Sequence, residues 1–255
     1  MSGSQSTEAM YDAHADSWVR HERVLLSDFT ARPRVLEALG EVAGLHVLDL
    51  GCGEGFVARQ IASRGAASVF GIDISAQMVE QAQKSAADMS PGTLDFVAAD
   101  ASVFDEFPRP HFDFAIAVFL FNYLRIEEMT RVMERVKQRL APRGKFIFTV
   151  PHPAYAFLRA DAPPFYFNSQ GKKYLDDADA ILEGEIWRRD NVVVPVRCVH
   201  KTFSDYFAAL RKAGFEKLPD VTELGVTKEH LALDPDFFGP LQGYPLHVLF
   251  QVENA

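Results

Sequence analysis

The sequence predicts an α/β fold, doubly wound, with a mainly parallel sheet. Short apolar runs alternate with amphipathic stretches as far as residue 150, and this alternation is the order of repeated β-α-β units. A turn with three glycines at alternate positions, Gly51, Gly53 and Gly55, follows the first apolar run. The length of 255 residues suits one α/β domain with an insertion. We therefore expect a single domain over residues 1–255.

The strands of the sheet are predicted from their apolar runs and from the turn residues that flank them. Helical stretches separate the first five runs, as parallel pairing requires. The predicted strands are His46–Leu50, Ser68–Ile72, Leu94–Ala98, Phe112–Phe119, Lys145–Val150, a strand near Phe215–Leu218 and Leu246–Val252.

Two helices have clear boundaries in the sequence. Apolar residues recur at helical spacing over residues 126–140, with charged residues between them, and Pro142 with Gly144 should end this helix. Thr202 and Asp205 have the spacing of a capping box at the start of a second helix. Both helices should cover the sheet.

The charge balance limits the classes of partner. The 35 acidic and 26 basic residues give a formal net charge of -9, and such a surface is a poor match for nucleic acid. The longest apolar run, Phe114 to Phe121, is too short to span a bilayer, and residues 1–7 lack the apolar core of a signal peptide. Cys52 and Cys198 form neither a disulfide framework nor a metal-ligand pattern. We expect a cytoplasmic protein without a metal.

The glycine turn indicates the chemistry of a ligand. Glycines allow a backbone to pass close to a ligand, as in dinucleotide sites, but the third glycine of the GxGxxG pattern would fall on Phe56. Asp49 precedes the turn, and its carboxylate would repel a pyrophosphate. A carboxylate there favours a cationic or hydroxyl-rich ligand, which argues against a nicotinamide dehydrogenase.

Residues 47–55, Val-Leu-Asp-Leu-Gly-Cys-Gly-Glu-Gly, resemble the first motif of the class I (Rossmann-like) methyltransferases. The resemblance implies S-adenosylmethionine as cofactor and a seven-stranded sheet with an antiparallel last strand and helices on both faces. It also implies that Asp73, after the second strand, holds both ribose hydroxyls. A carboxylate can accept from both hydroxyls of a diol; the alternative is an acid near a helix that Ser75 caps.

Further cofactor contacts are carried over from the same resemblance. Ala99-Asp100-Ala101 resembles the turn that reads adenine, although Asp100 alone could cap a short helix. Met78 is expected against the adenine, or simply in the core. The expected cofactor-binding residues are Asp49, Gly51, Cys52, Gly53, Gly55, Asp73, Ile74, Met78, Asp100, Ala101, Val118, Phe119 and Tyr11.

Two segments outside the repeated units are candidates for enclosing a substrate. Residues 1–30 resemble the family's opening helix, a lid over the cofactor, with Tyr11 and Trp18 as its aromatic residues. Residues 152–200 form an aromatic-rich insertion, which we interpret as a cap over the acceptor pocket; a hairpin covering a sheet edge or a dimer contact is the alternative. The expected substrate-binding residues are Asn122, Tyr123, His152, Tyr155, Trp187 and His200.

The predicted reaction is methyl transfer to nitrogen or oxygen of a small metabolite. His200 or His152 is a candidate base, and Tyr11 and Asn122 are candidate catalytic residues. Alignment of donor and acceptor without a base is the alternative. A methyltransferase of tRNA or protein, and an inactive S-adenosylmethionine-binding protein, are the alternative functions. We expect a monomer or a homodimer.

Overall fold

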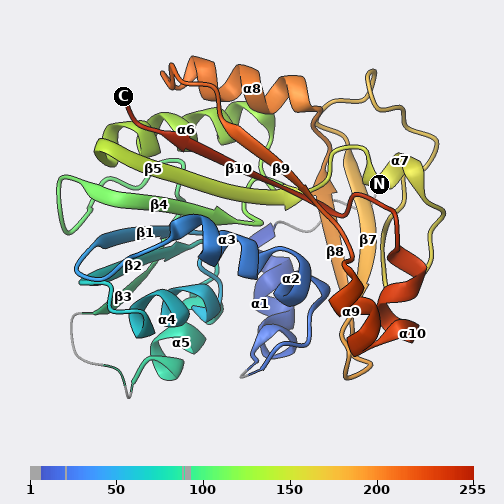
Figure 1. Cartoon of the computed structure of the whole chain (residues 1–255). Coiled ribbons are helices and arrows are strands. Elements are labelled where there is room, and N and C mark those ends of the chain that lie inside the picture. Colours follow the sequence, from blue (N-terminus) through green and yellow to red (C-terminus); the bar gives the residue numbers. More distant parts are fainter. Residues whose placement is uncertain (1–6, 21, 88, 90–92) are drawn as a thin grey trace.

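The main sheet has seven strands in the order β3-β2-β1-β4-β5-β10-β9 (Figure 1). This computed structural model describes residues 7–20, 22–87, 89 and 93–255. The strands are β1 (His46–Leu50), β2 (Ser68–Asp73), β3 (Leu94–Ala98), β4 (Phe112–Val118), β5 (Leu140–Pro151), β9 (Asp220–Leu224) and β10 (His247–Glu253).

The strand directions follow from the lengths of the connections. The first five strands pair in parallel, whereas β10 is antiparallel to both β5 and β9. Helical crossovers join β1 to β2, β2 to β3 and β4 to β5, but residues 99–111 cross from β3 to β4 through turns, without the helix that the sequence predicted. The expected mainly parallel sheet with an antiparallel last strand is confirmed. The strand order reverses between β1 and β4, and ligands of open α/β sheets bind at such a switch point, beyond the carboxyl ends of the strands.

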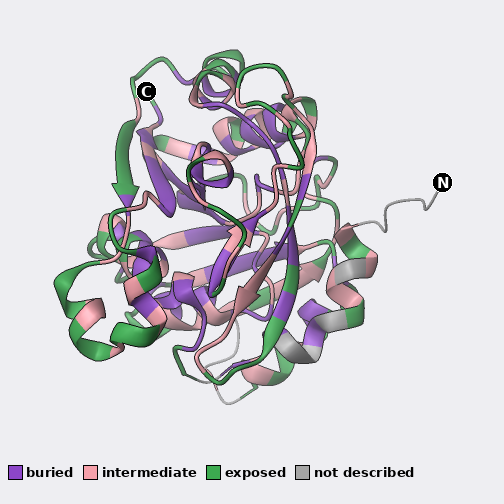
Figure 2. Cartoon of the chain, turned by 90° about the vertical axis from the view of Figure 1, so that its right-hand side faces the viewer, coloured by how far each residue is buried: buried purple, intermediate pink, exposed green. Residues whose placement is uncertain are grey.

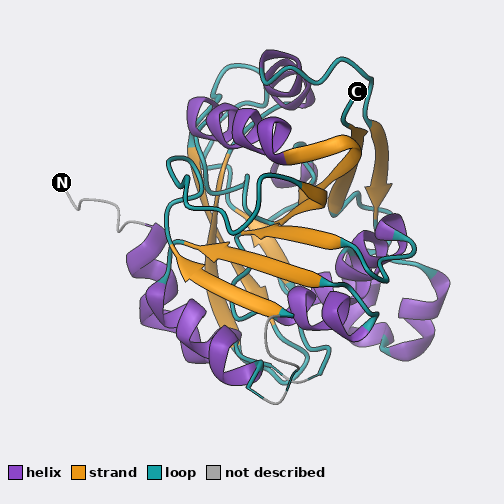
Figure 3. Ribbon diagram, turned by 90° about the vertical axis from the view of Figure 1, so that its left-hand side faces the viewer, coloured by secondary structure: helices purple, strands orange, loops and turns teal. Residues whose placement is uncertain are grey.

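Helices cover both faces of the sheet, as expected (Figure 3). The apolar stripe of α6, with Met129, Met133 and Val136, packs into the core on one face, and α3 and α4 bury their apolar residues on the other. Burial of such stripes contributes about 25 cal/mol for each Å² removed from water. The helices are α3 (Arg32–Leu39), α4 (Phe56–Ser63), α5 (Ala76–Ser85), α6 (Ile126–Arg139) and α8 (Phe203–Lys212).

A smaller antiparallel sheet, in the order β6-β7-β8, lies beside the carboxyl end of the main sheet. It is built from the insertion, and buried residues alternate with half-buried and exposed ones along its strands (Figure 2). The expected insertion is thus a hairpin with a third short strand. Its elements are α7 (Tyr155–Leu158), β6 (Phe165–Phe167), β7 (Ile181–Trp187) and β8 (Val193–Val199).

Segments from the two chain ends pack against the small sheet in one apolar cluster. Trp18 and Leu26 come from the N-terminal part of the chain, and Phe238 and Leu246 from the C-terminal part. The segments are α1 (Thr7–Trp18), α2 (Leu26–Thr30), α9 (Lys228–Leu233), α10 (Pro235–Phe238) and the 3₁₀ turn η1 (Gly239–Leu241).

Three sequence predictions of the elements are wrong in detail. The strand expected near Phe215–Leu218 is Asp220–Leu224, because Phe215 instead enters the core under α8. The helix ends at Arg139, before Pro142, and β5 starts directly at Leu140 with a register shift against β4. Phe119 lies outside β4 with a φ of 62°.

No described helix combines the length and the apolar character that crossing a membrane requires.

Candidate functional site

The glycine turn leaves β1 and is held against β2. The amides of Gly51 and Cys52 donate to the Ile72 carbonyl at 2.8 and 3.1 Å. Gly51 has a φ of +70°, and a Cβ there would lie 3.0 Å from the Leu120 Cβ. A side chain at this position would therefore be strained and crowded. The turn keeps its backbone open toward the carboxyl ends of β1 and β4.

Asp73, at the end of β2, faces the glycine turn. Its Oδ2 accepts from the Gly53 amide at 2.8 Å and its Oδ1 from the Ser75 amide at 3.0 Å. Ser75 caps α5, with its hydroxyl accepting from the Met78 amide at 3.1 Å. Two of the carboxylate's roughly four acceptor positions are thus used within the turn. Asp73 can therefore stabilise the turn before α5 and still accept hydrogen bonds from a ligand in the site.

Asp49, the last acid of β1, is 1% exposed, and its Oδ2 has no hydrogen-bond partner among the described residues. Burial, and then the nearby Asp73, raise the pKa of Asp49 to about 7. A buried carboxyl group without a partner costs free energy unless a ligand satisfies it. The site therefore holds an acceptor for a positively charged or hydrogen-bond-donating group.

A cavity of about 450 Å³ joins these groups, and this volume lies within the usual range for small-molecule sites, about 300–1,000 Å³. Of the expected cofactor-binding residues, all except Gly55 line it. Gly55 instead lies where a Cβ would be 3.0 Å from the Phe96 ring. Its role is the close packing of the turn on its neighbours.

Asp100, Ala101, Ile74 and Met78 line the cavity near the ends of β2 and β3. The Oδ1 of Asp100 accepts from the Ser102 amide at 2.8 Å, as a turn-capping acid does. Met78 is 4% exposed, whereas Ile74 is 40% exposed. Both side chains give this part of the lining an apolar surface.

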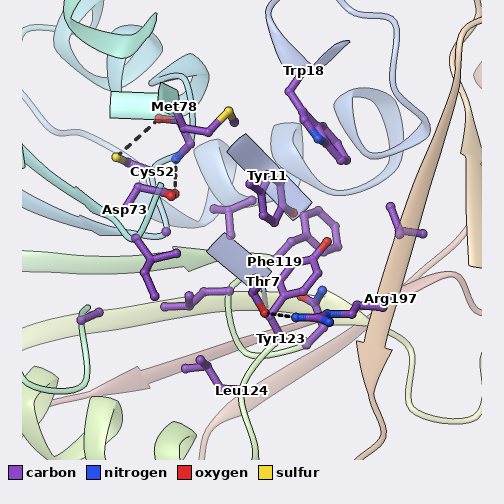
Figure 4. Close-up of a pocket in the computed structure, with 18 of the residues that line it drawn as sticks. Thr7, Tyr11, Trp18, Cys52, Asp73, Met78, Phe119, Tyr123, Leu124 and Arg197 are labelled. Atoms are coloured by element: carbon purple, nitrogen blue, oxygen red, sulfur yellow. Dashed lines mark hydrogen bonds between the residues drawn. The ribbon is translucent and has the colours of Figure 1, made fainter. Parts of the chain in front are cut away.

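Helix α1 lies across the cavity and contributes Tyr11 and Trp18 to its lining (Figure 4). The ring centroids of Tyr11 and Trp18 are 5.5 Å apart, and Ser75 donates a hydrogen bond to Asp12, which ties α1 to α5. After α1, Arg20 donates to Asp28 at 3.0 Å and to Glu54 at 3.1 Å. The N-terminal segment is therefore joined to the glycine turn by a buried ionic network.

Asn122 and Tyr123 follow β4 and also line the cavity. The Tyr123 ring packs edge-on against Tyr11 at 5.4 Å, and burial is the main cause that raises the pKa of both tyrosines. The Asn122 Oδ1 has no partner among the described residues, although the side chain is buried. Two neutral hydroxyl groups and an open amide oxygen thus face the same space.

The structure does not bring His152, His200, Tyr155 or Trp187 to the cavity lining. His152 Nε2 bonds to Glu223 at 2.8 Å, and His200 Nε2 bonds to the Tyr174 carbonyl at 2.8 Å. Both histidines lie beside a separate, far smaller void. The expectation that they border the cavity is not met, because the His152 ring packs against Phe203 and the His200 ring against Phe157 and Tyr174.

The other two residues, Tyr155 and Trp187, do not line the cavity. The Tyr155 hydroxyl donates to the Phe165 carbonyl at 2.6 Å, and its ring stacks on the Phe165 ring at 4.8 Å. Trp187 pairs with Tyr166 at 5.9 Å. Phe165 and Phe167 line the cavity in their place, because alternate residues of β6 point to it.

Sequence reasoning missed several polar residues of the lining, among them Arg20, Arg32, Arg197 and His247. Arg32 pairs with Asp28 at 3.1 Å, and burial lowers the pKa of His247 to about 3. Of these, only Arg197 could have been noticed in the sequence, because it is the single charged residue in the valine-rich run 192–199. The others depend on contacts between segments far apart in the sequence.

Comparison with known proteins agrees with this geometry. Residues 47–144 match a family described as "Methyltransferase domain". An uncharacterized protein of Haemophilus influenzae is 31% identical over 137 residues, which are 53% of each chain. The aklanonic acid methyltransferase DauC of a Streptomyces species is 29% identical over 156 residues, which cover 59% of this chain and 69% of DauC. The chain spans about half the length of most of the curated relatives it matches.

Solved structures extend the likeness over most of the chain. The S-adenosylmethionine-dependent methyltransferase from Mesorhizobium loti superposes with a TM-score of 0.64 at 26% identity, covering 87% of this chain and 96% of that one. The strand order, the glycine turn and these matches agree. Residues 47–144 thus match a methyltransferase domain, and the chain has the fold of the class I, Rossmann-like S-adenosylmethionine-dependent methyltransferases.

Proposed function

We propose that this protein transfers the methyl group of S-adenosylmethionine to a nitrogen or oxygen atom of a small metabolite. One observation carries the proposal: a single cavity extends from the glycine turn and Asp73 to the wall formed by the small sheet. Cofactor and acceptor can therefore meet in a space that α1 covers.

The residues present fit the cofactor. Asp49 offers an unsatisfied buried carboxylate to a cationic group, and Asp73 retains acceptor capacity for a diol. Ile74, Met78 and Asp100 suit a flat, partly polar ring system such as adenine. These residues, with Gly51, Cys52, Gly53, Ala101, Val118 and Phe119, would hold the cofactor.

When bound, S-adenosylmethionine supplies an electrophilic methyl group: the acceptor forms a bond to this carbon, the carbon–sulfur bond breaks with its electron pair left on sulfur, and the acceptor's proton is released. The chain's own contribution is alignment and exclusion of water. Tyr11 and Tyr123 stay protonated at neutral pH, since burial raises the pKa of each. They act as hydrogen-bond donors and positioning groups, and Asn122 accepts.

The acceptor is a small molecule with an apolar or aromatic body. Phe165, Phe167, Ile181, Ile186 and Val196 form the wall on the small sheet. A cavity closed in this way suits a metabolite better than a nucleic acid or protein segment, and the net charge of -9 adds to this preference. The named relative DauC is an aklanonic acid methyltransferase, which is a small-molecule enzyme.

Methyl transfer from labelled cofactor tests the proposal. The purified protein is incubated with methyl-labelled S-adenosylmethionine and, separately, with metabolite extract, bulk tRNA and total protein. We expect label in the metabolite fraction alone. Label in tRNA or protein and none in metabolites would support a polymer substrate, and cofactor binding without any product would indicate a binding protein that has lost its chemistry.

A further inference from the structure

His247, the first residue of β10, lines the cavity where the main sheet meets the small sheet. It pairs with Pro151 at the end of β5, and only 3% of its surface is exposed. The ring packs edge-on against Phe119, with the ring centroids 5.0 Å apart, and its centroid lies 5.8 Å from that of the Phe165 ring on β6. His247 therefore borders the part of the cavity that we assign to the methyl acceptor.

One ring nitrogen of His247 is engaged in a contact that decides its protonation. The Nδ1 atom lies 3.1 Å from the Thr30 hydroxyl oxygen, and the same hydroxyl donates to the Leu26 carbonyl at 3.0 Å. A hydroxyl group has a single proton to donate. Both contacts are therefore made at once only if Nδ1 carries the imidazole proton and donates it to Thr30. Because Thr30 and His247 are both buried, we expect the form that satisfies both contacts.

The other ring nitrogen, Nε2, then carries a lone pair and no proton. Within the described part of the chain Nε2 has no hydrogen-bond partner, and unlike the Asp49 Oδ2 it is not sealed in the core. Burial, and then the nearby Arg32 and His152, lower the pKa of His247 to about 3, so the ring stays neutral near neutral pH. A buried acceptor of this kind is satisfied by an O–H or N–H donor on a ligand.

The surroundings of the ring favour a neutral donor over an ammonium group. The burial and the Arg32 charge that keep a second proton off His247 also disfavour another cation beside the ring. The Arg32 guanidinium lies 5.4 Å from the centroid of the Phe119 ring, on which His247 also packs. Phe119 and Phe165 offer aromatic surface to the body of the ligand on either side of the nitrogen.

We propose that His247 determines specificity for the methyl acceptor: its Nε2 accepts a hydrogen bond from a neutral hydroxyl or N–H group on an apolar or aromatic molecule. Thr30 is a positioning residue, because it acts through the imidazole and fixes the form in which Nε2 is free to accept. This inference rests on the proposed function, but the contact is one of binding and can be measured without turnover.

The protonation of the ring is tested without a ligand. Protein with isotope-labelled histidine is studied by proton–nitrogen correlation NMR, and His247→Phe assigns the signals. We expect a protonated Nδ1 and an unprotonated Nε2 at pH 8 and at pH 6. In Thr30→Val, which removes the acceptor of the Nδ1 proton, a form with the proton on Nε2 should appear. Wild-type protein with the proton on Nε2 would overturn the proposal.

The contact itself is tested by affinity for matched probes on the protein saturated with S-adenosylhomocysteine. The pairs are 2-naphthol with 2-fluoronaphthalene, 4-phenylphenol with 4-fluorobiphenyl, and indole with benzofuran, with 2-naphthylmethylammonium as the cationic donor. The first member of each pair has a donor hydrogen that the second lacks. We expect at least one donor to bind about fivefold to tenfold more tightly than its partner, as a neutral hydrogen bond to a buried acceptor allows.

Variants assign the preference to His247. His247→Phe keeps an aromatic ring but no acceptor, so the ratio of affinities within a pair should fall nearly to one. His247→Gln should retain part of the ratio, because an amide oxygen also accepts, and Thr30→Val should lower it less than His247→Phe does. His152→Phe, at a histidine outside the cavity lining, is the matched control and should keep the wild-type ratio. Unchanged affinity for S-adenosylhomocysteine in each variant shows that the fold is intact.

The outcomes separate the two proposals. The site at His247 is overturned if no pair shows a preference for the donor, if the preference is undiminished in His247→Phe, or if the ammonium probe binds more tightly than 2-naphthol. Each of these results leaves cofactor binding in place. Failure of the wild-type protein to bind S-adenosylhomocysteine instead overturns the proposed function.

Discussion

The cavity has two halves that are built in different ways: the proposed cofactor half at the glycine turn and Asp73, and the proposed acceptor half at the small sheet. In the first, Asp49, the glycine turn and Asp73 come from consecutive strand ends, and Gly53 bonds to Asp73 only 20 positions away. In the second, Thr7 bonds to Arg197 across 190 positions. The glycine turn and Asp73 are thus positioned within one β-α-β unit, whereas the contact between Thr7 and Arg197 forms only after the N-terminal helix and the insertion have packed together.

The largest expected effect lies in the cofactor half, at Asp49. Burial holds the pKa of this acid at about 7, about three units above the ordinary value of 3.8. Since one unit corresponds to about 1.4 kcal/mol, Asp49→Asn should raise the free energy of unfolding by about 4 kcal/mol above pH 7. The folded state binds the extra proton between pH 4 and 7, so wild-type stability should fall as pH rises through this window.

Urea unfolding at pH 5 and at pH 8 measures this effect. The wild type should lose stability between the two values and the Asn variant should lose less, while its affinity for S-adenosylmethionine should be weaker because the cationic ligand loses a carboxylate. If the stability of both proteins depends on pH in the same way, ionised Asp49 does not destabilise the folded state and this prediction is wrong.

A second change separates the two halves directly. Asp73→Ala should weaken S-adenosylhomocysteine binding by about 1.5–3 kcal/mol, the cost of losing charge-assisted hydrogen bonds. Asp95→Ala, which removes an exposed carboxylate from the adjacent strand β3, is the matched control. Calorimetric titration of both variants is the measurement, and similar affinities in the two would remove Asp73 from the cofactor site.

In the acceptor half, Tyr155→Phe should have a smaller effect on stability and should leave the affinity for the cofactor unchanged. This variant deletes the 2.6 Å hydrogen bond to the Phe165 carbonyl and keeps the ring stacked. We expect a loss of about 1 kcal/mol in stability. KM for the acceptor should rise, because Phe165 loses part of its support, while S-adenosylhomocysteine affinity stays constant. A reduced cofactor affinity would show that the halves are coupled through the wall.

The smallest effect concerns the two histidines first considered as bases. A true general base contributes about a hundredfold to ten-thousandfold to kcat. His152 and His200 lie outside the cavity lining, so His152→Ala and His200→Ala should leave the acidic limb of the pH–rate profile in place and change kcat far less than that. Loss of the acidic limb in either variant would show that the substituted histidine acts as a general base.

The elements around the glycine turn could be predicted from the sequence because each signal for them is local. The acid before the glycines, the turn itself and Asp73 after the next strand are fixed by β-α-β geometry, and the predicted strands His46–Leu50 and Leu94–Ala98 match the structure. Ser75 was expected as a helix cap and caps α5. Short-range hydrogen bonds decide all of these features.

The acceptor half could not be predicted to the same depth. The aromatic composition of residues 152–200 indicated a wall over the pocket, but strand pairing decides which rings face inward. Phe165 and Phe167 line the cavity, whereas Trp187, on the partner strand, does not. His200 is turned toward the Tyr174 carbonyl. A shift of one residue in such pairing exchanges the two faces, and composition carries no information on this register.

Calorimetric titration of the wild-type protein with S-adenosylhomocysteine and with NAD tests the central claim most directly. The account predicts one site for S-adenosylhomocysteine and no binding of NAD, because Asp49 and the absence of a third glycine at Phe56 disfavour a pyrophosphate. Binding of NAD, or no binding of S-adenosylhomocysteine, would contradict it.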